Sequence, residues 1–99
     1  MQTDYPAQFE RDMGCTEAEW VAWMPRAIGA HAWQQQAAQI TVQVGGGSLR
    51  MSWSPLPERR IALLRMPRLL VRFEFEGVDA AARQAFMRPF DLSLQRGGG

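Results

Sequence analysis

Residues 39–53 read QITVQVGGGSLRMSW, and this stretch decides the fold. Apolar and polar residues alternate on both sides of three glycines, which is the pattern of two half-buried strands. The glycines can adopt a positive φ, so they suit a tight turn between antiparallel strands. The stretch therefore predicts a β-hairpin. Its buried face is formed by Ile40, Val42, Val44, Leu49, Met51 and Trp53.

A further strand is expected over residues 69–76, where the same alternation places Val71, Phe73 and Phe75 on the buried side. The second strand of the glycine hairpin is expected to end at residues 54–57, because proline cannot donate a hydrogen bond to a neighbouring strand. The glycine hairpin and the 69–76 strand are thus the firmest parts of the predicted sheet.

Residues 58–66 are open to two interpretations. Pro57 followed by Glu58 is typical of a first helical turn, and the residues that follow favour a helix. Their apolar side chains would point both ways in a strand, as in a central strand covered on both faces. We favour the strand, which would add a fourth member to the sheet.

A first helix is predicted to begin after Thr16. Thr16 and Glu19 have the spacing of a capping box, in which each side chain bonds to the backbone amide of the other. Pro25 should kink or restart this helix, and Gly29 should end it. Cys15 lies immediately before the cap.

A last helix is predicted over residues 80–88, with Asp79 as its cap. Phe86, Phe90 and Leu94 share one helical face, so the helix can continue past Pro89 as a kinked extension. The alternative is a short strand over residues 90–94.

These elements give an α+β fold: an N-terminal helix, an antiparallel β-meander of three to four strands, and a C-terminal helix, with the helices packed on one sheet face. The 99 residues suffice for one domain. We expect a loosely ordered N-terminal arm over residues 1–14, the single domain over 15–95, and a glycine-rich tail over 96–99.

The reactive side chains are few, because the chain has one cysteine, Cys15, and one histidine, His31. Nucleophilic and acid–base catalysis usually require such groups to be held against an oriented partner. We therefore expect no catalytic, cofactor-binding or metal-binding residues. The chain is not predicted to be an enzyme, and that function ranks a distant third.

The sequence gives no sign of membrane insertion or secretion. The N-terminus lacks a signal-peptide pattern, and no stretch approaches the roughly 18 apolar residues of a membrane span. A lone cysteine also fits a reducing compartment. We expect a soluble, cytoplasmic protein with no membrane partner.

Three tryptophans, Trp20, Trp23 and Trp33, are close together in the sequence. Tryptophan is enriched at the centres of protein interfaces, so these residues are the candidate interaction surface. The leading functional hypothesis is a protein-interaction module that binds an unknown protein or a second copy of itself.

The arginines suggest the alternative function, an RNA- or anion-binding domain. All eleven basic residues are arginine, and residues 50–99 have a net charge of +4 against −3 for residues 1–49. Arginines on an exposed sheet face can neutralise phosphates. The candidate patch consists of Arg50, Arg59, Arg60, Arg65, Arg68 and Arg72.

Overall fold

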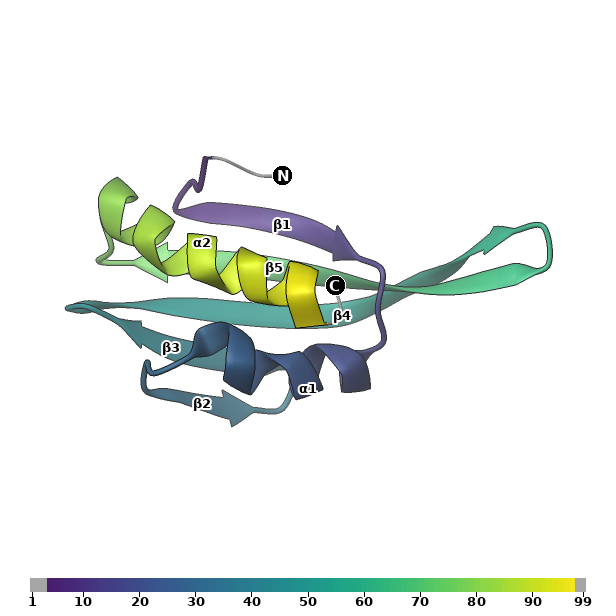
Figure 1. Cartoon of the computed structure of the whole chain (residues 1–99), viewed down its shortest axis with the longest axis horizontal. Coiled ribbons are helices and arrows are strands. Elements are labelled where there is room, and N and C mark those ends of the chain that lie inside the picture. Colours follow the sequence, from purple (N-terminus) through teal and green to yellow (C-terminus); the bar gives the residue numbers. More distant parts are fainter. Residues whose placement is uncertain (1–3, 98–99) are drawn as a thin grey trace.

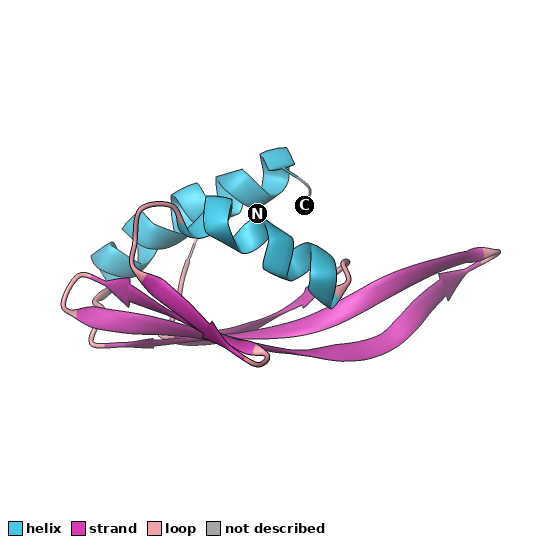
Figure 2. Cartoon of the chain, turned by 90° about the horizontal axis from the view of Figure 1, so that it is seen from below, coloured by secondary structure: helices cyan, strands magenta, loops and turns pink. Residues whose placement is uncertain are grey.

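The chain forms a five-stranded antiparallel sheet with both helices on one face (Figures 1 and 2). The computed structural model describes residues 4–97. In chain order the elements are β1 (Gln8–Met13), α1 (Glu17–Ile28), β2 (Trp33–Gln36), β3 (Gln39–Val44), β4 (Gly47–Ile61), β5 (Leu64–Glu76) and α2 (Ala80–Gly97). The strands lie in the order β1-β5-β4-β3-β2. The α+β class is confirmed, but the predicted order is wrong: a strand precedes the first helix, and the strands number five rather than three to four.

The glycine hairpin is confirmed as β3 and β4. Val44 pairs with Gly47 across a loop formed by Gly45 and Gly46, and Gly45 has a φ of 59°. All nine residues predicted for the covered face are buried. They are Ile40, Val42, Val44, Leu49, Met51, Trp53, Val71, Phe73 and Phe75.

Helix α1 begins and ends where the sequence predicts. The Thr16 amide donates to Glu19 Oε1 at 2.9 Å, and the Glu19 amide donates to Thr16 Oγ1 at 3.1 Å, which completes the capping box. Gly29 ends the helix with a φ of 72°. Trp53 Nε1 also donates to Glu17 Oε2 at 2.7 Å, so β4 is bonded to the first turn of α1.

Helix α2 continues through Pro89, and the alternative strand over residues 90–94 is wrong. Phe90 is fully buried and Leu94 nearly so, because the helical face predicted for them meets the core. The Ala82 amide donates to the Asp79 carboxylate at 2.8 Å, as expected of a cap. The predicted tail begins inside this helix, and residues 98–99 lie outside the described residues.

The segment expected to be a loosely ordered arm contributes strand β1. Its residues pair with β5 from Gln8, opposite Glu74, to Met13, opposite Leu69. Phe9 stacks on Phe73 with ring centroids 4.7 Å apart. The alternation is hard to see in the sequence because the core-facing position between Phe9 and Met13 is occupied by Arg11.

Arg11 is accommodated under α2 by a carboxylate from that helix. Its guanidinium donates to both oxygens of Asp91, at 2.7 and 3.0 Å, and the Tyr5 hydroxyl donates to the same carboxylate at 2.7 Å. The guanidinium also lies over the rings of Phe9 and Phe73. Asp91 is only 7% exposed, so two groups from the chain's beginning satisfy a buried charge near its end.

Tyr5 should make the free energy of unfolding depend on pH in the alkaline range. Burial, together with the hydrogen bond to Asp91, raises the pKa of Tyr5 to about 12 from 10.0. The folded protein therefore keeps the Tyr5 proton at pH values where the unfolded chain loses it. The contribution of Tyr5 to the free energy of unfolding is fully present below about pH 10 and falls by up to about 3 kcal/mol as the pH rises towards 12. Urea unfolding at successive pH values measures the loss. An equal loss in Tyr5→Phe would show that another group is responsible.

Strand β2 was not predicted, because the segment before β3 resembled a polar linker. Trp33 pairs with Val42 and the three glutamines complete a short edge strand. The turn that follows contains Ala37 at a φ of 53°, a conformation usually occupied by glycine or asparagine. The usual sequence signal of a tight turn is therefore missing at this position.

Candidate interaction surface

The far end of the β4–β5 hairpin, residues 57–67, projects away from the rest of the described chain and is here called the projecting hairpin (Figure 1). Strand β3 reaches β4 only as far as Ser52, and β1 reaches β5 only as far as Leu69. Beyond these points β4 and β5 pair only with each other and extend past both helices (Figures 1 and 2). This extension makes the long dimension of the molecule 47 Å, against 28 and 22 Å for the others.

Strand β4 runs through two prolines, although the sequence predicted that it would end at residues 54–57. The Trp53 amide donates to Ala38 on the β3 side. Alternate residues direct their backbone nitrogens to the same side, so Pro55 faces that side beyond the last residue of β3, and Pro57 lies where the register of β4 and β5 shifts, between Leu56 and Arg59. No strand lies there to accept a hydrogen bond, and proline is tolerated at such an edge.

The strand preferred for residues 58–66 is confirmed only in part, and a central strand covered on both faces is wrong. Residues 58–61 end β4, Ala62 and Leu63 form a turn, and β5 begins at Leu64. Five large apolar side chains are exposed among the described residues, and four belong to this segment. They are Ile61 at 53%, Leu63 at 100%, Leu64 at 65% and Met66 at 43% exposure.

Three arginines accompany these apolar residues. Arg60 lies directly opposite Arg65, and Arg59 lies opposite Met66. Among the described residues, no carboxylate lies within ion-pair distance of Arg59, Arg60 or Arg65. The projecting hairpin therefore combines exposed apolar area with positive charge. The charge of Arg59 helps to lower the pKa of Asp12, whereas Arg60 and Arg65 form no ion pair among the described residues.

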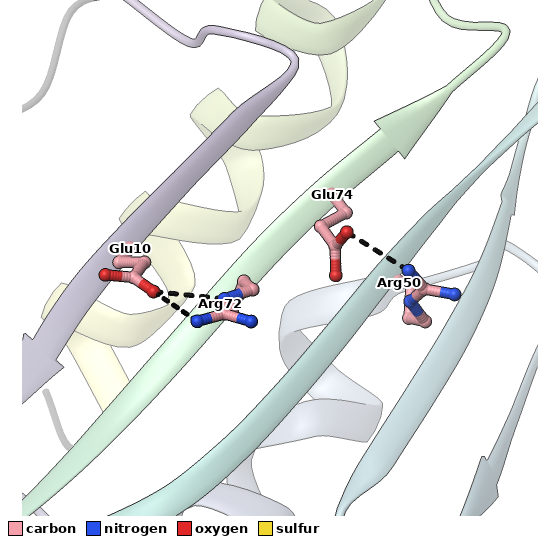
Figure 3. A network of polar contacts seen from close by, with 4 residues as sticks. All are labelled: Glu10, Arg50, Arg72 and Glu74. Atoms are coloured by element: carbon pink, nitrogen blue, oxygen red, sulfur yellow. Dashed lines mark hydrogen bonds and ion pairs between the residues drawn. The ribbon is translucent and has the colours of Figure 1, made fainter.

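The other three arginines of the predicted patch bind acids on the uncovered sheet face. Arg72 donates to Glu10 at 2.8 Å and Arg50 to Glu74 at 3.1 Å (Figure 3). Arg68 donates to Asp12 at 2.6 Å, and these hydrogen bonds lower the pKa of Asp12. The six arginines thus separate into three paired residues on the sheet and three on the projecting hairpin.

The three tryptophans do not form one exposed patch, in contrast to the predicted interaction surface. Trp20 is fully buried, with its ring against those of Trp53, Phe73 and Phe90. Trp23 and Trp33 are partly buried and pack against the core from α1 and β2, respectively. The three tryptophans are close together in the sequence because they pack between the helices and the sheet, and not because they form a common surface.

The hollow beside Trp23 is too small for an organic ligand. It has a volume of about 60 Å³ and is lined by Ala22, Trp23, Arg26 and Ser93, whereas ligand sites usually enclose roughly 300 Å³ or more. Burial raises the pKa of the Cys15 thiol to about 11, which makes it a poor nucleophile at neutral pH. No group of three or more His, Cys, Asp or Glu residues suited to a metal ion occurs within residues 4–97.

Two further findings bear on function. No protein family model, curated protein or solved structure matches the chain. Neither described helix is both long enough and apolar enough to cross a membrane.

Sequence reasoning missed the apolar residues of the projecting hairpin because it placed them in the core. The turn carries no glycine, asparagine or aspartate, and Ala62 takes a φ of 55° instead. One signal was available: prolines at 55, 57 and 67 flank the segment on both strands, and paired strands with prolines at their edges are typical of a sheet margin.

Proposed function

We propose that this chain is a small, non-catalytic interaction module of the cytoplasm whose contact surface is the projecting hairpin. The observation that carries this proposal is the joint exposure of Ile61, Leu63, Leu64 and Met66. Apolar side chains gathered on a surface mark contact sites, because their burial by a partner is favourable. The tryptophans are a weaker candidate, since Trp20 is already enclosed by the core.

RNA or anion binding remains the second candidate, supported by Arg59, Arg60 and Arg65. None of the three forms an ion pair among the described residues, and the charges of Arg60 and Arg65 are the most available, since that of Arg59 also acts on Asp12. RNA recognition usually adds aromatic rings that stack on bases, and residues 57–67 contain none. The apolar side chains therefore favour a partner that offers apolar surface.

Site-specific photo-crosslinking in cells that express the protein tests the contact surface. A photoreactive amino acid is placed at Leu63, at Gln43 on the uncovered sheet face, or at Ala22 beside Trp23; all three side chains are exposed. We expect discrete protein or lipid adducts from position 63 and few from the other two. The adducts should disappear when Ile61→Asp and Leu64→Asp are added.

Crosslinking from position 22 or 43 in preference to position 63 would overturn the proposed surface. The Ile61→Asp and Leu64→Asp variants must also remain folded. Since Ile61 and Leu64 contact solvent, we expect their substitution to change the free energy of unfolding by no more than about 0.5 kcal/mol. Thermal unfolding of each variant checks this.

A further inference from the structure

The composition of the projecting hairpin limits what it can recognise. Within residues 57–67 every residue is apolar, a proline or an arginine, with the sole exception of Glu58. This segment has no aromatic ring and no neutral side chain that forms hydrogen bonds. It can offer apolar contact and positive charge, so a matching surface supplies apolar area and negative charge without a fixed pattern of polar groups.

The order of these residues along the projecting hairpin is equally informative. Leu63 is at the tip, Ile61 and Leu64 come next as a pair, and Arg60 and Arg65 follow as the next pair. At about 3.3 Å per residue, the arginines lie roughly 7 Å behind Leu63. This length fits the roughly 5–10 Å to which peripheral elements bury apolar side chains in a membrane interface.

The opposed arginines indicate a negatively charged partner. Arg60 and Arg65 occupy directly opposite positions, an arrangement in which like charges destabilise a strand pair. An anionic surface in contact with both side chains would remove this repulsion. Contact with such a surface would therefore stabilise the projecting hairpin itself.

We infer that the tip of the projecting hairpin binds the surface of an anionic lipid bilayer, with Leu63, Ile61 and Leu64 inserted and Arg60 and Arg65 at the headgroups. This inference rests on the proposed function, because it names the partner of the same surface. It replaces the expectation of no membrane partner, which rested on the lack of a spanning segment; a peripheral contact needs none. The cytoplasmic leaflet supplies anionic lipids.

Other partners fit the projecting hairpin less well. Two copies joined at their tips would bring together four arginines, Arg60 and Arg65 of each copy, that form no ion pair among the described residues. A nucleic-acid groove would leave Ile61, Leu63 and Leu64 without apolar contacts. Protein interfaces concentrate their binding energy in Trp, Tyr and Arg, and this segment has only arginine of the three.

Vesicle co-sedimentation of the full chain tests the inference. We expect binding to vesicles of three parts phosphatidylcholine to one part phosphatidylglycerol, and weak binding to phosphatidylcholine alone. Leu63→Asp should lower the partition coefficient at least about tenfold. The double variant Arg60→Gln/Arg65→Gln should lower it roughly 25-fold, since each arginine near an anionic surface contributes about fivefold.

Matched controls exist elsewhere on the chain. Leu92→Asp makes the same chemical change on α2, where Leu92 is 43% exposed. Arg26→Gln/Arg88→Gln removes the same net charge from exposed positions on the two helices. Both controls should bind the anionic vesicles within about twofold of the parent chain, because neither changes the inserted tip.

Insertion can be observed directly with an environment-sensitive dye on Leu63→Cys. The natural Cys15 is 1% exposed and has a pKa raised to about 11, so it should not compete for the label. The dye emission should shift to the blue with anionic vesicles, whereas a dye on Gln43→Cys should not respond.

Several results would overturn this inference. Equal binding to neutral vesicles, no vesicle binding, or binding that the controls reduce as much as the tip variants would each do so. Stronger binding to a nucleic-acid duplex than to the anionic vesicles would also contradict it. If the chain does not bind vesicles but position 63 crosslinks to one protein, the membrane inference is wrong and the proposed function stands. If the chain neither binds vesicles nor crosslinks from position 63, the projecting hairpin is not a contact surface.

Discussion

Asp91→Ala is expected to lower the free energy of unfolding by about 3 to 5 kcal/mol. The substitution removes the carboxylate that accepts from Arg11 and Tyr5, and the Arg11 side chain is only 17% exposed. The guanidinium between β1 and α2 would then lose the carboxylate to which it donates two hydrogen bonds. Urea unfolding followed by tryptophan fluorescence measures the loss.

Glu10→Ala is the matched control for Asp91→Ala. It also removes an acid bonded to an arginine, but the Arg72 and Glu10 side chains are 57% and 48% exposed. Pairs in such contact with water contribute at most about 1 kcal/mol. If both variants lost the same small amount of stability, the buried carboxylate would not be what holds β1 to α2.

Gly47→Ala is expected to destabilise the protein by about 3 kcal/mol or more. A Cβ atom at this position would overlap the backbone carbonyl groups of Glu76 and Gly77, and backbone atoms cannot turn aside as a side chain can. The ends of β4 and β5 would have to separate. The change should appear in chemical denaturation as a lower midpoint.

Gly46→Ala makes the same chemical change one residue earlier. Nothing lies within 4 Å of a Cβ atom there, and this glycine does not have a positive φ. We expect the free energy of unfolding of Gly46→Ala to stay within about 0.5 kcal/mol of that of the parent chain or to rise slightly. An equal effect at both positions would mean that loss of glycine flexibility, and not the close contact at Gly47, determines the cost.

The residues that stabilise the fold and the proposed contact surface lie in different parts of the molecule. The aromatic and aliphatic core and the Asp91 carboxylate hold the sheet to the helices. The exposed apolar side chains of the projecting hairpin make no comparable contribution, since they are in water. Substitutions there can therefore change binding without changing the fold, which makes the proposed contact surface open to experiment.

The sequence by itself determined the covered sheet face, the glycine hairpin and both helix starts. Each of these depends on neighbours in the chain: alternation in residues 39–53, the Thr16–Glu19 capping box and the Asp79 cap. It also identified the arginines that lie on the projecting hairpin. It could not show that Arg50, Arg68 and Arg72 are already bound to acids.

Tertiary structure decided the edges of the sheet and the exposure of the hairpin tip. Strand β1 is held by contacts with β5 and α2, whose residues are distant in sequence, and this pairing makes a core-facing Arg11 acceptable. An apolar residue is exposed or buried according to whether another element covers it. At Leu63 no element of the described chain does, because β3 and β1 both end before the projecting hairpin begins.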